Sequence, residues 1–70
     1  MASFELGKHP YVELCDLLKL EGWSESGAQA KAIIAEGLVK VDGVTETRKR
    51  CKIVADQTVT FASLSITVKE

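Results

Sequence analysis

The densest run of chemically capable side chains lies near the middle of the chain, where four cations fall within five residues. They are Arg48, Lys49, Arg50 and Lys52, and no acidic residue interrupts them. Arginine and lysine side chains spaced this closely offer several hydrogen-bond donors to phosphate oxygens. The same pattern is also typical of a solvated strand edge, where lysine discourages pairing with another chain. The run alone leaves phosphate binding and edge protection equally open.

A second feature that favours anions lies earlier in the chain. Ser26 and Gln29 have the spacing of a capping box, in which each side chain satisfies a backbone N–H at the start of a helix. The helix predicted from this signal begins at Ala28. Its first turn carries the positive end of the helix dipole, and Lys31 follows one turn in, so this helix end favours phosphate. Two independent features of this kind shift the expectation toward binding.

Residues able to catalyse a reaction or to hold a metal are scarce. His9 is the only imidazole, and its place beside Pro10 is typical of a cap or a solvated loop residue. Cys15 and Cys51 are the only cysteines and lack a Cys-x-x-Cys spacing, so we expect reduced, structural thiols and neither a zinc site nor a disulfide. We therefore predict no enzyme activity, no catalytic residue, no metal and no cofactor.

The composition is that of an ordinary globular protein. The 70 residues are 46% hydrophobic and 27% charged, which excludes a disordered or fibrous chain. A chain of this length predicts a single domain, residues 1–70, of modest stability. No apolar stretch has the length of a membrane span, and the N-terminus lacks the apolar core of a signal peptide, so we expect a cytoplasmic protein. The formal net charge of −1 argues against a general polyanion binder. Any binding of phosphate must therefore depend on how the cations are distributed along the chain.

The elements that would position the candidate residues follow from hydropathy and turn signals. A short strand is expected at residues 3–6, and a first helix at residues 11–20 that buries its leucine-rich face. Trp23 follows this helix, where its ring most simply covers the end of the core, with stacking on an RNA base as the alternative. The second helix stops at Gly37, which tolerates the left-handed conformation.

The remainder of the chain reads as strands. Residues 39–41 and 44–47 flank Asp42-Gly43, the dipeptide that best fits a type I′ hairpin turn, and further strands are expected at residues 58–61 and 66–69. This order predicts an α+β fold in which two helices pack on a small antiparallel β-sheet. The residues expected in the core are Leu14, Leu18, Ile33, Ile34, Val41 and Phe61.

Several of these residues together resemble a known RNA-binding domain. Residues 26–31, with Gly37, Asp42-Gly43 and Arg48 after them, are similar to the domain named after the fourth small-subunit ribosomal protein, here called the S4-like family. The resemblance covers residues 11–61 and implies the alpha-L motif, two helices followed by a strand-turn-strand that present a basic face to structured RNA. It implies that the RNA-facing residues are Ser26, Gln29, Lys31, Lys40, Arg48, Lys49, Arg50 and Lys52.

Two positions depart from the family pattern. Gly27 stands where many members carry arginine after the capping serine, which removes one phosphate contact, and Asp56 stands at the usual glycine of the last turn. The function predicted is a non-catalytic, monomeric RNA-binding module for structured RNA, with ribosomal RNA as a candidate ligand and no membrane or small-molecule substrate. The alternative is a protein-interaction adaptor that uses its polarised charge surface.

Overall fold

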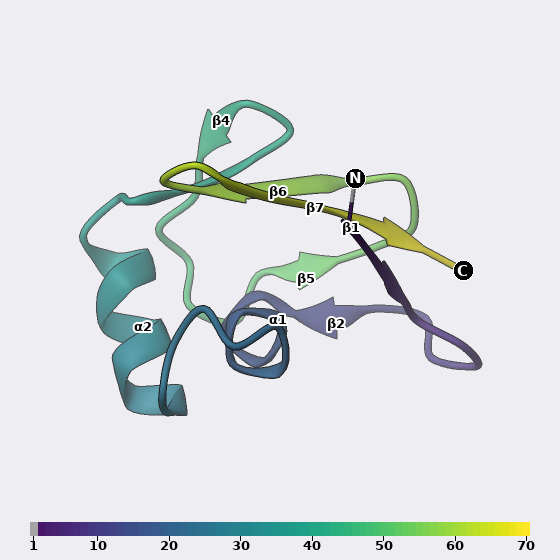
Figure 1. Ribbon diagram of the computed structural model, residues 1–70, viewed down its shortest axis with the longest axis horizontal. Helices are drawn as coiled ribbons and strands as arrows, with labels where there is room; N and C mark the ends of the chain where they lie inside the picture. Colours follow the sequence, from purple (N-terminus) through teal and green to yellow (C-terminus); the bar gives the residue numbers. More distant parts are fainter. Residues whose placement is uncertain (1) are drawn as a thin grey trace.

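The computed structural model describes residues 2–70 and has two helices on one face of a sheet (Figure 1). The main sheet has five strands in the order β1-β7-β6-β3-β4, and β2 pairs with β5 in a separate two-stranded sheet. In chain order the elements are β1 (Ala2–Glu5), β2 (Val12–Glu13), α1 (Leu14–Leu20), α2 (Gly27–Ala35), β3 (Val39–Val41), β4 (Val44–Thr45), β5 (Lys52–Ile53), β6 (Thr58–Phe61) and β7 (Leu64–Lys69). The α+β class predicted from the sequence is confirmed.

The main sheet is mixed, which corrects the prediction that it is antiparallel. The pairs β3–β4, β3–β6 and β6–β7 are antiparallel, whereas β1 runs parallel to β7, with Phe4 opposite Val68. A parallel pair requires a long connection, and here that connection contains both helices and all the other strands. Local turn signals cannot reveal a pairing between the two ends of a chain.

The hairpin at Asp42-Gly43 forms as predicted. Asp42 and Gly43 have φ angles of 52° and 84°, and Val41 lies opposite Val44, which is the geometry of a two-residue type I′ turn. The carboxylate of Asp42 accepts a hydrogen bond from the N–H of Thr58 at 2.9 Å. This bond fastens the turn to β6. The second arm is shorter than the predicted residues 44–47, because β4 ends at Thr45.

The helix α2 begins at Gly27, one residue before the predicted start, and its N-cap residue is Ser26. The Ser26 hydroxyl accepts a hydrogen bond from the N–H of Gln29 at 3.1 Å, as a capping box requires. The Gln29 side chain accepts from the N–H of Glu25 at 2.6 Å, one residue earlier than in the standard box. Gly37 follows the helix with a φ of 78°, so the predicted stop is confirmed.

The helix α1 is shorter than the predicted residues 11–20. Val12 and Glu13 are extended and form β2, with Val12 opposite Ile53 of β5. A β-branched residue such as Val12 suits a strand. Its strand partner comes from a distant part of the chain, so the apolar pattern of the sequence placed the start of the helix too early.

The core lies between the sheet and the helices. Leu14, Leu18, Ile34 and Val41 are buried as predicted, whereas Ile33 and Phe61 are only partly buried and pack against its margin. The ring of Trp23 lies 6.3 Å from that of Phe61, centroid to centroid. The two rings close one end of the core, which supports the role as a plug. Other buried hydrophobic residues include Leu17, Ile53, Val59, Ile66 and Val68.

Both cysteines carry free thiols, of which Cys15 is buried and Cys51 is partly buried. No helix within residues 2–70 has the length and apolar character needed to cross a bilayer.

Candidate nucleic-acid interface

The basic run forms the loop between β4 and β5, and its backbone is fastened to the start of α1. The N–H of Leu14 donates to the carbonyl of Cys51 at 2.9 Å, and the N–H of Cys15 donates to the carbonyl of Lys49 at 3.2 Å. Glu13, the N-cap residue that precedes α1, makes no side-chain hydrogen bond to the helix end. The loop carbonyls therefore satisfy amides that the helix leaves without partners. We call residues 47–51 the basic loop.

Arg48 is held by an acidic residue within the same loop region. Its Nε donates to Glu46 Oε2 and its Nη2 to Glu46 Oε1, both at 2.9 Å, and its backbone N–H donates to Glu46 Oε2 at 3.0 Å. This two-pronged pair lowers the pKa of Glu46 to about 2, mainly through the side-chain hydrogen bond, and raises the pKa of Arg48. No acidic residue interrupts the run in the sequence, but Glu46 lies two residues before Arg48 and pairs with it. The prediction that the cations have no acidic partner nearby is therefore wrong for Arg48.

The other three cations of the run are as exposed as Arg48 or lie in looser contacts than its pair with Glu46. Lys49 is exposed, and Arg50 places its Nε 3.7 Å from Glu13 Oε2 with its side chain 75% exposed, a separation and exposure at which solvent screens the attraction. The Nζ of Lys52 lies 5.1 Å from the centre of the Tyr11 ring, within the range of a cation–π contact. Arg48, Arg50, Cys51 and Lys52 line one shallow hollow, so the structure gathers three of the four cations of the run at one place, and Lys49 is not part of this lining.

The thiol of Cys51 is part of the same cluster. It donates to Glu46 Oε1 at 3.5 Å, and burial, followed by the bond to Glu46, raises its pKa. A raised pKa reduces the thiolate fraction and hence the reactivity of a cysteine. Cys51 therefore fits the structural role predicted for it.

The remaining candidate residues lie elsewhere. Ser26 and Gln29 serve the cap of α2, and Lys31 is exposed on that helix. Lys40 is exposed between buried Val39 and Val41, so it points to the sheet face opposite the core and the helices. The structure thus divides the eight candidate residues into a loop group, an α2 group and Lys40 alone.

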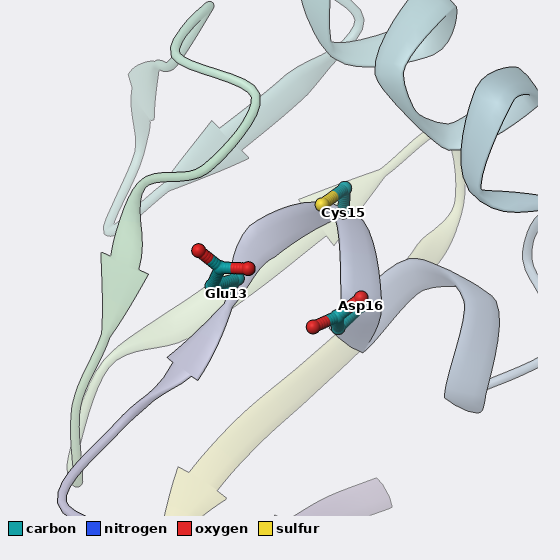
Figure 2. Close-up of side chains that lie close together, drawn as sticks. All are labelled: Glu13, Cys15 and Asp16. Atoms are coloured by element: carbon teal, nitrogen blue, oxygen red, sulfur yellow. The ribbon is translucent and has the colours of Figure 1, made fainter.

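Groups suited to catalysis or metal binding are few in the described part of the chain. Figure 2 shows the side chains of Glu13, Cys15 and Asp16 close together. Their possible ligand atoms lie within 4.8 Å of one another. Cys15 belongs to the apolar core and exposed acids often cluster without an ion, so this group does not mark a metal centre. Among residues 2–70, every buried side-chain nitrogen or oxygen has a hydrogen-bond partner. No orphaned polar group points to a reaction site.

Comparison with known proteins identifies the family of the chain. Residues 4–69 match the model of the S4 domain family. The chain is 79% identical over 68 residues to YbcJ of Escherichia coli (strain K12) and to YbcJ of Shigella flexneri, with 97% of each protein covered. It is also similar to the solution structure of YbcJ from E. coli, which is described as revealing an alpha-L motif involved in RNA binding. That match has a TM-score of 0.77 and 77% identity and covers 100% of this chain and 89% of the other.

These similarities confirm the resemblance found at residues 11–61 and extend it to the terminal strands β1 and β7. In this chain the alpha-L motif consists of α1, α2 and the hairpin of β3 and β4. The chain belongs to the S4 domain family.

Proposed function

We propose that this protein is a non-catalytic module that binds structured RNA through phosphate contacts. Membership of the S4 domain family supports RNA as the class of ligand, and the similar YbcJ structure is described as containing a motif involved in RNA binding. The observation that carries the proposal is the basic loop, whose carbonyls are fastened to α1 while the side chains of Lys49 and Arg50 extend into solvent.

A fixed loop is better suited to phosphate than a flexible one. Ordering a flexible cationic segment on binding costs free energy, and a loop whose backbone already has its final shape avoids most of that cost. Arg48 contributes to this shape by holding Glu46. Its guanidinium has five N–H donors, and the bonds to the Glu46 side chain use only Nε and one N–H of Nη2. Nη2 also donates to Cys51 Sγ at 3.6 Å, so the two N–H donors of Nη1 are the ones available to a phosphate oxygen.

The start of α2 is a second contact region in this proposal. The amides of Gly27 and Ala28 belong to the first turn, where the helix dipole favours an anion. The Ser26 oxygen accepts the capping bond, so its O–H can still donate to phosphate. Exposed Glu25 lies next to this helix end and weakens its attraction, so the basic loop supplies the larger share.

Contacts of this kind select RNA by its shape. Phosphate contacts set position and orientation but carry no base information, and folded RNA presents its backbone in arrangements that a rigid surface can distinguish. We therefore propose a folded RNA, with ribosomal RNA as a candidate, as the ligand of a monomeric protein.

Crosslinking in cells tests this function directly. Ultraviolet crosslinking followed by sequencing of the attached RNA should recover folded RNA with the wild-type protein, and the yield should fall for the variant Lys49→Ala/Arg50→Ala. The proposal fails if the variant recovers the same RNA at the same yield, or if the partners recovered with the protein are proteins that survive nuclease treatment.

A further inference from the structure

A groove lies beside the N-terminal strand, between β1, the loop after it and the exposed side of α1. The apolar part of its lining comes from Phe4 of β1, from Leu6 and Tyr11 of the loop and from Leu20 of α1, and the volume is about 720 Å³. Grooves of this size hold several side chains of a ligand. Tyr11 and Leu20 are 37% and 65% exposed, so a partner that covers them would remove apolar surface from water.

The strand β1 offers an open backbone edge next to this groove. Within residues 2–70, β1 is the end strand of its sheet and pairs with β7 alone. The N–H of Leu6 donates to the carbonyl of Lys69 at 2.7 Å, and alternate residues of a parallel strand direct their amides to opposite edges. The amides of Ser3 and Glu5 therefore face away from β7. An extended peptide can continue a sheet at such an edge through main-chain hydrogen bonds.

The charges that line the groove select the sign of the occupant. Three carboxylates, those of Glu5, Glu13 and Asp16, border it against the ammonium group of Lys19. A second ammonium group, that of Lys52, lies 5.1 Å from the centre of the Tyr11 ring, which also lines the groove. Figure 2 shows Glu13 at the end of β2 close to Asp16 in the first turn of α1. A carboxylate oxygen of Glu13 lies within 4.8 Å of one of Asp16. Two carboxylates this close repel one another, and an ammonium or guanidinium group between them relieves the repulsion. The ion pair of Glu13 with Arg50 is long at 3.7 Å and largely exposed, so it leaves Glu13 accessible.

We propose that this groove binds an extended, basic segment of a partner protein. The segment adds as a strand at the free edge of β1, opposite the amides of Ser3 and Glu5. On one side of that strand an apolar side chain covers Tyr11 and Leu20, and a lysine or arginine reaches the carboxylates of Glu13 and Asp16. RNA does not fit this surface, because the same carboxylates repel phosphates. The groove therefore gives the protein a second partner, of a different class from the RNA of the proposed function.

A designed peptide tests the proposal on the full chain. The probe is an eight-residue peptide of alternating lysine and valine with blocked ends, titrated into ¹⁵N-labelled protein and followed by amide chemical shifts. The expected result is a set of saturable shifts confined to β1, Tyr11 and the exposed side of α1. The variant Asp16→Asn/Leu20→Ala should bind the peptide about fivefold or more weakly, since one exposed ion pair alone accounts for up to about that factor. Both residues are exposed, so the variant should fold normally.

Matched controls separate this mode from general attraction to an acidic surface. The variant Glu36→Gln/Leu38→Ala removes one exposed acid and one exposed apolar side chain from the segment that follows α2. Because α2 and β1 lie on opposite sides of α1 in Figure 1, this variant should bind like wild type. A peptide with proline at its central positions should bind more weakly, because it lacks strand N–H groups. Equal binding of a glutamate–valine peptide, equal weakening by both variants, or shifts at the same residues on adding an RNA hairpin would overturn the proposal.

Discussion

Replacing Lys49 and Arg50 with alanine should weaken RNA binding in a manner that depends on salt and leave the fold intact. The attachment of Lys49 to α1 uses its carbonyl, which alanine retains, and the Arg50 pair with Glu13 is long and exposed. Such a pair contributes about 1 kcal/mol at most. Arg48 is a poorer choice for this test, because its removal would also release Glu46 and disturb the loop.

The magnitude follows from counterion release. If Lys31, Lys49, Arg50 and Lys52 each contact a phosphate, the slope of log affinity against log salt is about −3, at roughly −0.7 to −0.9 per contact. Loss of two contacts flattens the slope by about 1.4 to 1.8. Between 50 and 200 mM salt the wild type should then lose roughly 60-fold in affinity, and the double variant only about tenfold.

Fluorescence anisotropy with a labelled RNA hairpin, across a salt series, measures both slopes. The matched control is Lys8→Ala/Lys69→Ala, which removes the same charge from exposed positions in the turn after β1 and at the end of β7. Its slope should equal that of wild type. An unchanged slope for the loop variant, or equal flattening by the control, would show that the basic loop is not the contact surface. A midpoint of thermal unfolding within a few degrees of wild type confirms that both variants are folded.

Three further substitutions test the fold and the ion pair of Arg48 with Glu46. Ile34→Ala should lower the free energy of unfolding by about 2 to 4 kcal/mol, because Ile34 is fully buried; a loss below about half a kcal/mol in urea titration would contradict its place in the core. Gly43→Val should cost about 1 to 3 kcal/mol, since Gly43 has a φ of 84° that a β-branched residue adopts poorly; an unchanged urea midpoint would argue against the type I′ turn. Arg48 lowers the pKa of Glu46 from 4.5 to about 2. The ion pair of Arg48 with Glu46 should therefore stabilise the folded protein fully at a pH above the pKa that Glu46 has in the unfolded chain, and less as the pH falls toward 2. Urea unfolding at neutral pH and near pH 2.5 should show a small advantage of wild type over Glu46→Gln that shrinks in acid, because solvent screens an exposed pair; an advantage that grows in acid would contradict this prediction.

The parts of the fold that could be predicted from the sequence are those with local causes. The cap of Ser26 on Gln29 and the turn at Asp42-Gly43 each depend on residues within a few positions, and both form. The parallel pairing of β1 with β7 and the pairing of Val12 with Ile53 depend on distant segments. Residues near Val12 therefore read as the start of a helix, since nothing local reveals the strand partner.

Two features of the candidate interface could have been predicted from the sequence, and one could not. Alternation of Val39, Lys40 and Val41 places Lys40 on the sheet face opposite the core, and the helices must cover the core face, so its separation from α2 follows from the pattern. Glu46 lies two residues before Arg48, close enough to pair across a turn. The attachment of the Lys49 carbonyl to Cys15 could not be predicted, because backbone bonds between a loop and a helix end leave no mark on residue type.

This attachment explains how a chain with a formal charge of −1 can present cations to a polyanion. The carbonyls of Lys49 and Cys51 fasten the basic loop to α1, so the side chain of Lys49 is not needed to hold the loop. Glu46 neutralises Arg48 and fixes the shape of the loop, which leaves Lys49 and Arg50 free for a ligand. Cations on a fixed backbone lose less entropy on binding than the same cations on a flexible tail. We therefore expect the local geometry of the loop, rather than the net charge of the protein, to determine whether RNA binds.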